Sequence, residues 1–369
     1  MSNPVCALIL VEPCPPLFVA IAVNESGDNA IAITVTFDDE VFVSGTPTIT
    51  LETGPTNATA SYASGSGGAT LTFTYTVATG HTSTDLEYSG TDALAAAGGA
   101  WIRDANSTDA NTATLTLPGV GNAGSLGNNK ALIIDTTAPT VRHVYSNVNA
   151  GSYNHVDDGA GDNVIPILVW FTEVVTVSGT PVLTLETGTN DAAVNYAEGT
   201  GSDELTFNYT VAAGHTTADL DYVSVSSLTA GTSIRDAAKN DATRTLATPY
   251  EAGSLGGNEA LIIDTTAPTV TSVSSTLANG TYNLNQLVPI TIEFSEDVIV
   301  TGTPLLALET GDDDANASYN AGTGSSTLTL NYTVATGNES ADLDYKATSS
   351  LGAGASIRDA AKNDATRTL

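Results

Sequence analysis

Hydrophobic residues alternate with polar ones at three places in this 369-residue chain. Residues 71–77 read Leu-Thr-Phe-Thr-Tyr-Thr-Val, and close variants of this run occur at 205–211 and 328–334. A period of two places the apolar side chains on one face of an extended strand and the polar side chains on the other. The pattern therefore predicts half-buried β-strands.

The alternating runs belong to a longer sequence repeat. Gly-Thr-Pro begins at Gly45, Gly179 and Gly302, and one fourteen-residue block is identical at 233–246 and 356–369. The period matches a whole domain of about 100–150 residues and is too long for a solenoid unit. We expect an N-terminal strand and linker at 1–16, followed by repeat 1 (17–135), repeat 2 (136–264) and repeat 3 (265–369), with repeat 3 lacking its last strand.

Turn signals separate the apolar runs within each repeat. Residues 64–68 read Ser-Gly-Ser-Gly-Gly, and residues 322–325 read Gly-Thr-Gly-Ser. Such clusters mark tight turns, and no segment shows the apolar stripe of an amphipathic helix. About seven short strands per repeat are typical of a two-sheet sandwich. The sequence predicts an all-β fold of three tandem immunoglobulin-like or cadherin-like sandwiches in an extended rod.

One block links the repeats. Residues 131–141 and 260–270 both read Ala-Leu-Ile-Ile-Asp-Thr-Thr-Ala-Pro-Thr-Val, and Ala7–Leu17 aligns with them without a gap as a degenerate copy. Where the block is complete it closes one repeat and opens the next, so we expect the N-terminal copy to complete repeat 3 of a neighbouring chain, head to tail. The expected assembly strand consists of Val5, Cys6, Ala7, Leu8, Ile9, Leu10 and Val11. The other interpretation is that the chain is a piece of a longer array.

Composition favours an extracellular surface role. The formal net charge is −31, with 10 basic residues against 41 acidic ones. Such a chain repels nucleic acid and anionic bilayers and attracts cations. The sequence has no apolar span of transmembrane length and no clear signal peptide. We expect the partners to be copies of the chain and the cell surface or matrix, with no nucleic acid.

The two cysteines, Cys6 and Cys14, lie close together near the start of the chain. In an extended strand they would lie roughly 25 Å apart, beyond the reach of a disulfide, although a turn at Pro13 would change this. Two interpretations stay open: unpaired thiols or a local clip, and a disulfide across a contact between subunits.

Several runs carry a family resemblance, most completely in repeat 3. They are Phe-Ser-Glu-Asp-Val at 294–298, Gly-Thr-Pro at 302–304, Leu-Glu-Thr-Gly at 308–311, Asp-Leu-Asp-Tyr at 342–345 and Ile-Arg-Asp-Ala-Ala-Lys-Asn at 357–363. With the linking block, they make the chain resemble the SWM repeat and, more distantly, bacterial Ig-like repeats of adhesins and S-layer proteins. The resemblance extends over nearly the whole chain from Ala7. It implies an extracellular rod, often stiffened by calcium.

Acidic residues recur in register at the ends of the repeats. Calcium takes six to eight oxygen ligands from carboxylates, amides and carbonyls. If the strands run alternately up and down, the recurring acids converge on two joints between repeats. The candidate Ca²⁺ ligands are Asp135, Glu173, Asp236 and Asp85 at the first joint, and Asp264, Glu296, Asp359 and Asp219 at the second. The competing interpretation is that these acids are solvated turn residues.

Enzyme motifs are not recognisable. The sequence contains no nucleophile elbow, His-Glu-x-x-His, Cys-x-x-Cys or phosphate-binding loop. His81 and His215 occupy one repeat position where repeat 3 has Asn338, which is typical of a turn residue. Two functions remain: a structural subunit of a head-to-tail filament or sheath assembled by strand donation, and a spacer segment of a large calcium-stiffened adhesin or S-layer protein.

Overall fold

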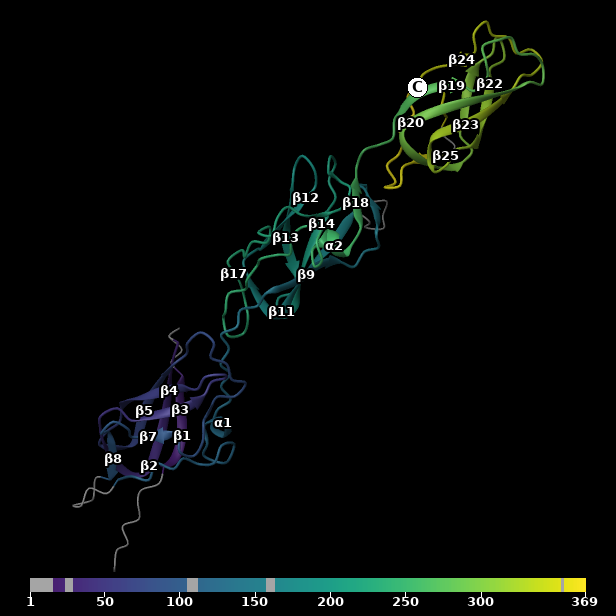
Figure 1. Ribbon diagram of the computed structural model, residues 1–369. Helices are drawn as coiled ribbons and strands as arrows, with labels where there is room; N and C mark the ends of the chain where they lie inside the picture. Colours follow the sequence, from purple (N-terminus) through teal and green to yellow (C-terminus); the bar gives the residue numbers. More distant parts are fainter. Residues whose placement is uncertain (1–15, 24–28, 105–111, 157–162, 353–354) are drawn as a thin grey trace, which may run out of the picture. The chain divides into compact units, whose positions relative to one another are not determined.

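The computed structural model describes residues 16–23, 29–104, 112–156, 163–352 and 355–369 (Figure 1). The expected assembly strand and both cysteines lie outside these ranges. In the described part of the chain, the only helices are two single turns, α1 (Leu126–Asn129) and α2 (Leu255–Asn258). Neither has the length or the apolar character needed to span a bilayer. The rest of the secondary structure is β, as the alternating pattern predicted.

Each repeat contributes its own set of strands. Repeat 1 contains β1 (Pro16–Val23), β2 (Ala30–Ser44), β3 (Thr48–Glu52), β4 (Ala58–Ser64), β5 (Gly68–Thr76), β6 (Glu87–Tyr88), β7 (Leu94–Ala95) and β8 (Trp101–Asp104). Repeat 2 contains β9 (Val141–Ser146), β10 (Gly151–Tyr153), β11 (Val164–Ser178), β12 (Val182–Glu186), β13 (Ala192–Glu198), β14 (Ser202–Thr210), β15 (Thr216–Thr217), β16 (Asp221–Tyr222), β17 (Ser233–Arg235) and β18 (Leu261–Asp264). Repeat 3 contains β19 (Val270–Ser275), β20 (Leu287–Gly302), β21 (Leu305–Glu309), β22 (Ala315–Ala321), β23 (Ser325–Thr333), β24 (Asp344–Tyr345) and β25 (Ala355–Arg358).

The strand order is the same in all three repeats. It is β1-β2-β5-β4-β3-β6 in repeat 1 and β19-β20-β23-β22-β21-β24 in repeat 3, and repeat 2 follows it with β9-β11-β14-β13-β12-β16. The long strand of each repeat changes partner at a break in register. In β20 the break lies between Glu293 and Val298; before it the strand pairs with β19 and β23, and after it Val298 pairs once more with β23 and residues 299–302 pair with β25. One strand thereby serves two layers, which gives each repeat its sandwich-like character.

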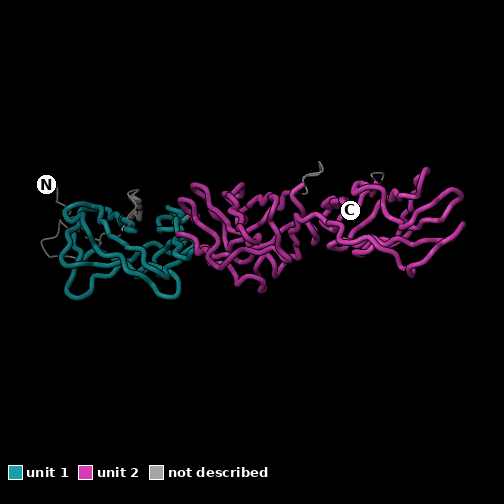
Figure 2. The backbone as a smooth tube through the Cα atoms, turned by 90° about the horizontal axis from the view of Figure 1, so that it is seen from above, with its two compact units in different colours: residues 1–138, 238–240 teal, residues 139–237, 241–369 magenta. Residues whose placement is uncertain are grey.

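Three hydrophobic cores form, one within each sequence repeat. In β14 the alternation works as the sequence predicted, because Leu205, Phe207 and Tyr209 are buried while Asn208 and Thr210 are exposed. By backbone contacts, however, the chain divides into two compact units (Figure 2). Unit 1 comprises residues 1–138 and 238–240, and unit 2 comprises residues 139–237 and 241–369, so repeats 2 and 3 share a unit.

A glycine is required at one turn of every repeat. These glycines have φ angles of 111°, 111° and 115°, in the left-handed region that a side chain disfavours. A Cβ at each would lie 2.1 to 2.2 Å from a backbone carbonyl oxygen across the turn. The turns between the fourth and fifth strands, or their counterparts, therefore depend on Gly65, Gly199 and Gly322.

The closing segment of repeat 2 does not join the main sheet. Strand β18 lies between β10, to which it is parallel, and β15, to which it is antiparallel. Leu261 and Ile263 point into the core and are almost fully buried, whereas Ile262 is 40% exposed. The matching segment of repeat 1 makes a bridge between Ile134 and Ser83. The segment thus closes one side of the core instead of extending a sheet.

Replacing Phe73 with Ala should destabilise repeat 1 by about 3–5 kcal/mol, because the ring is fully buried and its removal leaves a cavity. The matched control is Phe42→Ala, since the Phe42 side chain is 46% exposed and its loss should cost about 1 kcal/mol or less. Urea unfolding followed by circular dichroism measures both. Similar losses for the two variants would contradict the core assignment.

Candidate metal centre and an open groove

Three carboxylates meet where repeat 2 passes into repeat 3, inside unit 2. They come from the end of β18 (Asp264), the register break of β20 (Glu296) and the turn after β25 (Asp359). Each offers an oxygen that lies within 4.8 Å of an oxygen of the other two. Ligands held at about 2.4 Å by a single Ca²⁺ are separated by no more than twice that distance. The spacing therefore fits a shared cation.

Asn363 organises this cluster. Its backbone N–H donates to Asp359 Oδ1 at 2.8 Å, and its side-chain amide donates to Asp359 Oδ2 at 2.7 Å and to the carbonyl oxygen of Asp264 at 2.9 Å. Asp359 and Asn363 are both buried, at 4% exposure. Asp264 is fixed separately, because its Oδ1 accepts the N–H of Thr266 at 2.9 Å. Hydrogen bonds within the fold therefore hold two of the three acidic residues, Asp264 and Asp359, in place.

The electrostatics of the cluster favour a cation. Burial raises the pKa of the Glu296 carboxyl, and the negative charges of Asp264 and Asp359 raise it further. Burial also raises the pKa of Asp359, an effect that the hydrogen bonds from Asn363 oppose and the charge of Asp264 reinforces. Mutual repulsion of this kind is relieved by a bound positive ion. All three ligands are hard oxygens, which suit Ca²⁺, Mg²⁺ or Mn²⁺.

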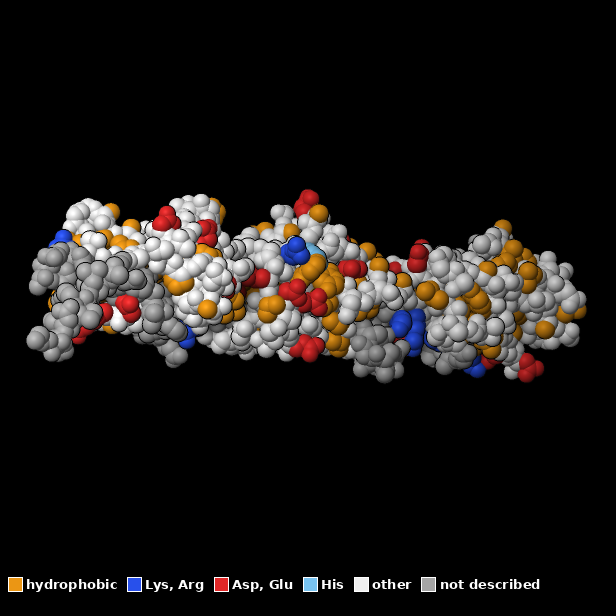
Figure 3. All heavy atoms as spheres, turned by 90° about the horizontal axis from the view of Figure 1, so that it is seen from below, with side chains coloured by type: hydrophobic (Ala, Val, Ile, Leu, Met, Phe, Trp, Pro, Cys, Tyr) orange, Lys and Arg blue, Asp and Glu red, His pale blue; other side chains and the backbone are white. Residues whose placement is uncertain are grey.

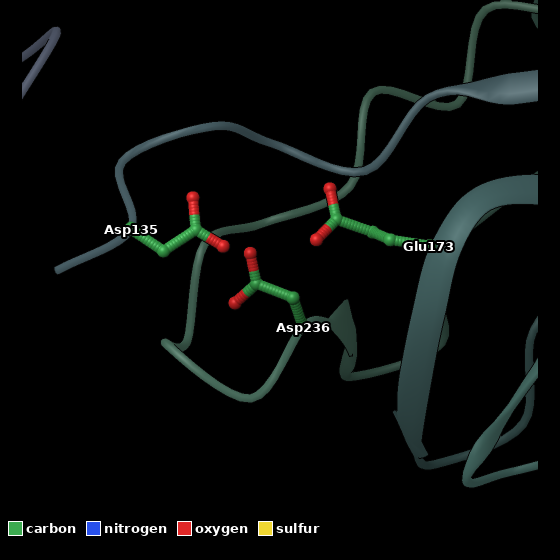
Figure 4. A group of neighbouring side chains, drawn as sticks. All are labelled: Asp135, Glu173 and Asp236. Carbon is green, nitrogen blue, oxygen red and sulfur yellow. The ribbon is translucent and has the colours of Figure 1, made fainter. Parts of the chain in front are cut away.

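The same residue types recur one repeat earlier. Glu173 comes from the register break of β11, and Asp236, which is 6% exposed, follows β17. Their side chains point toward one another in Figure 4. Asp135, the sequence counterpart of Asp264, belongs to unit 1, where its carbonyl oxygen accepts the amide of Asn240 at 3.1 Å. Asn240 thus repeats the contact that Asn363 makes with the carbonyl oxygen of Asp264.

The structure does not bring Asp85 and Asp219 to the joints. Asp85 Oδ1 accepts the N–H of Leu132 at 3.3 Å, and Asp219 is bonded by the backbone of Leu261. The segment that carries each aspartate runs antiparallel to the closing segment, which moves it three residues away from the linker aspartate. Asp85 and Asp219, which the sequence suggested as the fourth ligand of each joint, therefore bond to the closing segment instead.

The repeated histidine is a turn residue. His215 Nδ1 lies 2.9 Å from the hydroxyl of Tyr209 and accepts the N–H of Ala212 at 3.3 Å. In repeat 3 the side-chain oxygen of Asn338 makes both contacts, with Tyr332 and Ala335. Burial lowers the pKa of His215. An amide replaces the imidazole without loss of the contacts, so they do not require a titrating group.

Repeat 3 contains an open groove of about 580 Å³. Its floor includes Leu306, Leu308 and Tyr332, and its sides include residues 280–282 and 339–340. The sides are the sequence counterparts of β10 and β15, the two strands that hold β18 in repeat 2. The groove therefore occupies the position that the closing strand fills in repeat 2.

Exposure of one leucine shows that the groove is uncovered. Leu86 and Leu220 are fully buried in repeats 1 and 2, but their counterpart Leu343 is 37% exposed. The N–H groups of Leu86 and Leu220 each donate to a carbonyl of the closing segment at 2.7 Å. Within the described residues of repeat 3, Leu343 has no such partner. That repeat 3 takes up a strand here stays a prediction of the sequence, and the structure adds the position of Leu343 beside the groove.

One face of the molecule shows how its acidic side chains are distributed. On the face shown in Figure 3, acidic side chains are scattered and do not form a single patch.

Comparison of the chain with protein-family models and with curated proteins finds no match.

In cation-free buffer the protein should melt at a higher temperature at about pH 5 than at about pH 7. The raised pKa values of Glu296 and Asp359 mean that the folded state binds more protons than the unfolded chain just above the ordinary values of 4.5 and 3.8. Stability therefore falls as pH rises through that window. Glu296→Gln should reduce this slope, as thermal melts at several pH values can measure.

The control for the pH experiment is Asp312→Asn, which removes one charge from an exposed turn of the same repeat. It should leave the slope near that of the unmodified protein. An unchanged slope in Glu296→Gln would mean that the cluster is not the source of the pH dependence.

Proposed function

We propose that the chain is an extracellular structural protein built of three tandem Ig-like or cadherin-like sandwiches in an extended rod. Its repeat 3 is completed by a strand donated from a neighbouring chain, giving a head-to-tail filament or sheath at the cell surface or in a matrix. The open groove at the position of β18 carries the proposal. The family resemblance of the sequence to SWM and bacterial Ig-like repeats supports the same location.

The donor in this proposal is the segment Val5–Val11 of a second copy. Its Ala-Leu-Ile-Leu-Val at 7–11 aligns with Ala-Leu-Ile-Ile-Asp at 260–264. Because Leu261 and Ile263 are the buried residues of β18, the aligned Leu8 and Leu10 are the side chains that enter the groove. Ile9 aligns with the half-exposed Ile262 and faces outward. Backbone pairing on both sides would supply affinity, and the two leucines would fix the register.

The contact joins different surfaces of the two copies, so it does not close on itself and propagates as a fibre. A covered groove also removes the unpaired edges that invite aggregation. Repeat 3 contains no cysteine, so a disulfide between subunits through Cys6 or Cys14 would have to join the N-terminal segments of two copies.

Deleting residues 1–12 should leave repeats 1 and 2 folded and abolish filaments, as electron microscopy and sedimentation can show. A second variant, Leu8→Asp with Leu10→Asp, keeps the chain length and should also abolish filaments, because the two charged side chains cannot be buried in the groove. Filaments of normal length from either variant would contradict donation by this segment. That result would favour the alternative function, a spacer segment of a larger protein whose repeat 3 is completed by a different segment.

The acidic cluster favours a second role, as a calcium-stiffened stalk. Asp264, Glu296 and Asp359 link the last strand of repeat 2 to two elements of repeat 3, so an ion bound by all three would restrain the linker between them. The proposal is compatible with the filament, because each subunit of a fibre must also transmit force along its own joints.

Adding Ca²⁺ at a hundredfold excess over its Kd should stabilise the folded state by about 2.7 kcal/mol for one site. Calorimetry with Ca²⁺ and with chelator measures the shift. Glu296→Gln should remove the part due to the second joint, whereas Asp312→Asn should retain it. A melting temperature that does not respond to Ca²⁺ would mean that the cluster does not bind the ion.

A further inference from the structure

The closing segments of repeats 1 and 2 contain a helical turn before their pairing residues, which form a bridge at Ile134 in repeat 1 and strand β18 in repeat 2. In both, a buried serine, Ser125 or Ser254, caps the single-turn helix. The first helical residue, Leu126 or Leu255, is fully buried in the core. Strand and turn together therefore cover the side of the sandwich that remains open in repeat 3.

A carboxylate in the sandwich receives this turn. In repeat 1, Glu87 accepts the N–H of Leu126 at 3.1 Å and the N–H of Gly127 at 3.0 Å. In repeat 2 its counterpart Asp221, which is fully buried, accepts the N–H of Tyr250 at 2.7 Å, in the chain that leads into the turn and before its capping residue Ser254. Hydrogen bonds from backbone N–H groups to an ionised carboxylate are stronger than those between neutral groups.

The same carboxylate is ready in repeat 3. Asp344 Oδ1 accepts the N–H of Tyr345 at 2.8 Å, as Asp221 Oδ1 accepts that of Tyr222 at 2.8 Å. Asp344 nevertheless lines the open groove and is exposed. Asp344 is therefore oriented like Asp221 and Glu87, the carboxylates that accept N–H groups of the closing segment in the other two repeats.

A second contact lies beside it. Asn258, at the end of α2, donates its side-chain amide to the carbonyl oxygen of Val144 at 2.8 Å, and the N–H of Val144 donates to the carbonyl of Gly253. Val273, the counterpart of Val144, lines the groove of repeat 3. The groove of repeat 3 therefore contains Val273 and Asp344, the counterparts of two residues that hold this segment in repeat 2.

We infer that the groove of repeat 3 recognises a turn and a strand together, and that its preferred occupant is a peptide segment with the pattern of residues 250–264. This inference rests on the proposed function, since it names the partner of the same groove. Asp344 would accept the N–H groups of the turn, and Asp342 would accept the first N–H of the strand, as Asp85 does from Leu132.

The N-terminal segment matches only the strand part of this pattern. In the ungapped alignment, Met1–Pro4 stands opposite Ser254–Gly257. Ser2 replaces the buried Leu255, and Pro4 lacks the N–H that Gly257 donates to Ser254 Oγ at 3.0 Å. A joint closed by residues 5–11 is therefore incomplete, and a full closing segment should displace it.

The test is the binding of two fluorescent peptides to the full chain, kept below its assembly concentration and measured by anisotropy. One peptide has the sequence of residues 250–264 and the other that of residues 259–264. We expect the longer peptide to bind at least tenfold more tightly. Asp344→Asn should weaken the longer peptide about fivefold and leave the shorter one unchanged, because only the turn contacts Asp344.

Asp312→Asn serves as the charge-matched control outside the groove and should change neither affinity. Equal affinities for the two peptides, or an equal loss of both in Asp344→Asn, would overturn recognition of the turn and leave strand donation standing. Failure of both peptides to bind the monomeric chain would overturn the proposed donation itself.

Discussion

Every sandwich in this chain depends on covering one open side of its core. The strands of each repeat bury their inward residues in one core, and the leucine that precedes the sixth strand or its counterpart donates its N–H to a closing segment. Leu86 and Leu220 are fully buried beneath their closing segments, whereas Leu343, for which the described residues contain no such segment, is 37% exposed. Burial of a leucine side chain contributes about 1.5–3 kcal/mol, so the uncovered groove is a local deficit that a partner segment can offset. Assembly in the proposed function follows from this constraint.

The register break of the long strand connects this core to the joint between repeats. At the break, β20 leaves one layer and enters the other, and the intervening residues include Glu296. Bulges of this kind redirect side chains and are found beside functional sites. The closing strand of the preceding repeat ends at Asp264, in the same place. Strand β18 therefore both covers the core of repeat 2 and places Asp264 in the acidic cluster at the start of repeat 3.

The sequence predicted the strands well because their period-two pattern is strong and is repeated three times. It also predicted that Asp264, Glu296 and Asp359 would converge, from the recurrence of acids beside turns. It did not predict where Asp219 lies. Placing that residue required knowing that residues 216–217 run antiparallel to the closing strand, a pairing that no local pattern encodes. Asp221 and Glu87 were likewise missed as acceptors, since their role depends on contacts with residues about thirty to forty positions away. The alternation Asp-Leu-Asp-Tyr was the available signal, because a carboxylate next to a buried tyrosine needs partners.

Hydrogen exchange at the Leu343 amide tests the central claim most directly. The equivalent amides of Leu86 and Leu220 donate to the closing segment at 2.7 Å and should exchange slowly in all states. In dilute monomer the Leu343 amide should exchange quickly, and in the assembled protein it should become as protected as the other two. Rapid exchange at Leu343 in fully assembled protein, with Leu86 and Leu220 protected, would contradict completion of repeat 3 by a donated strand.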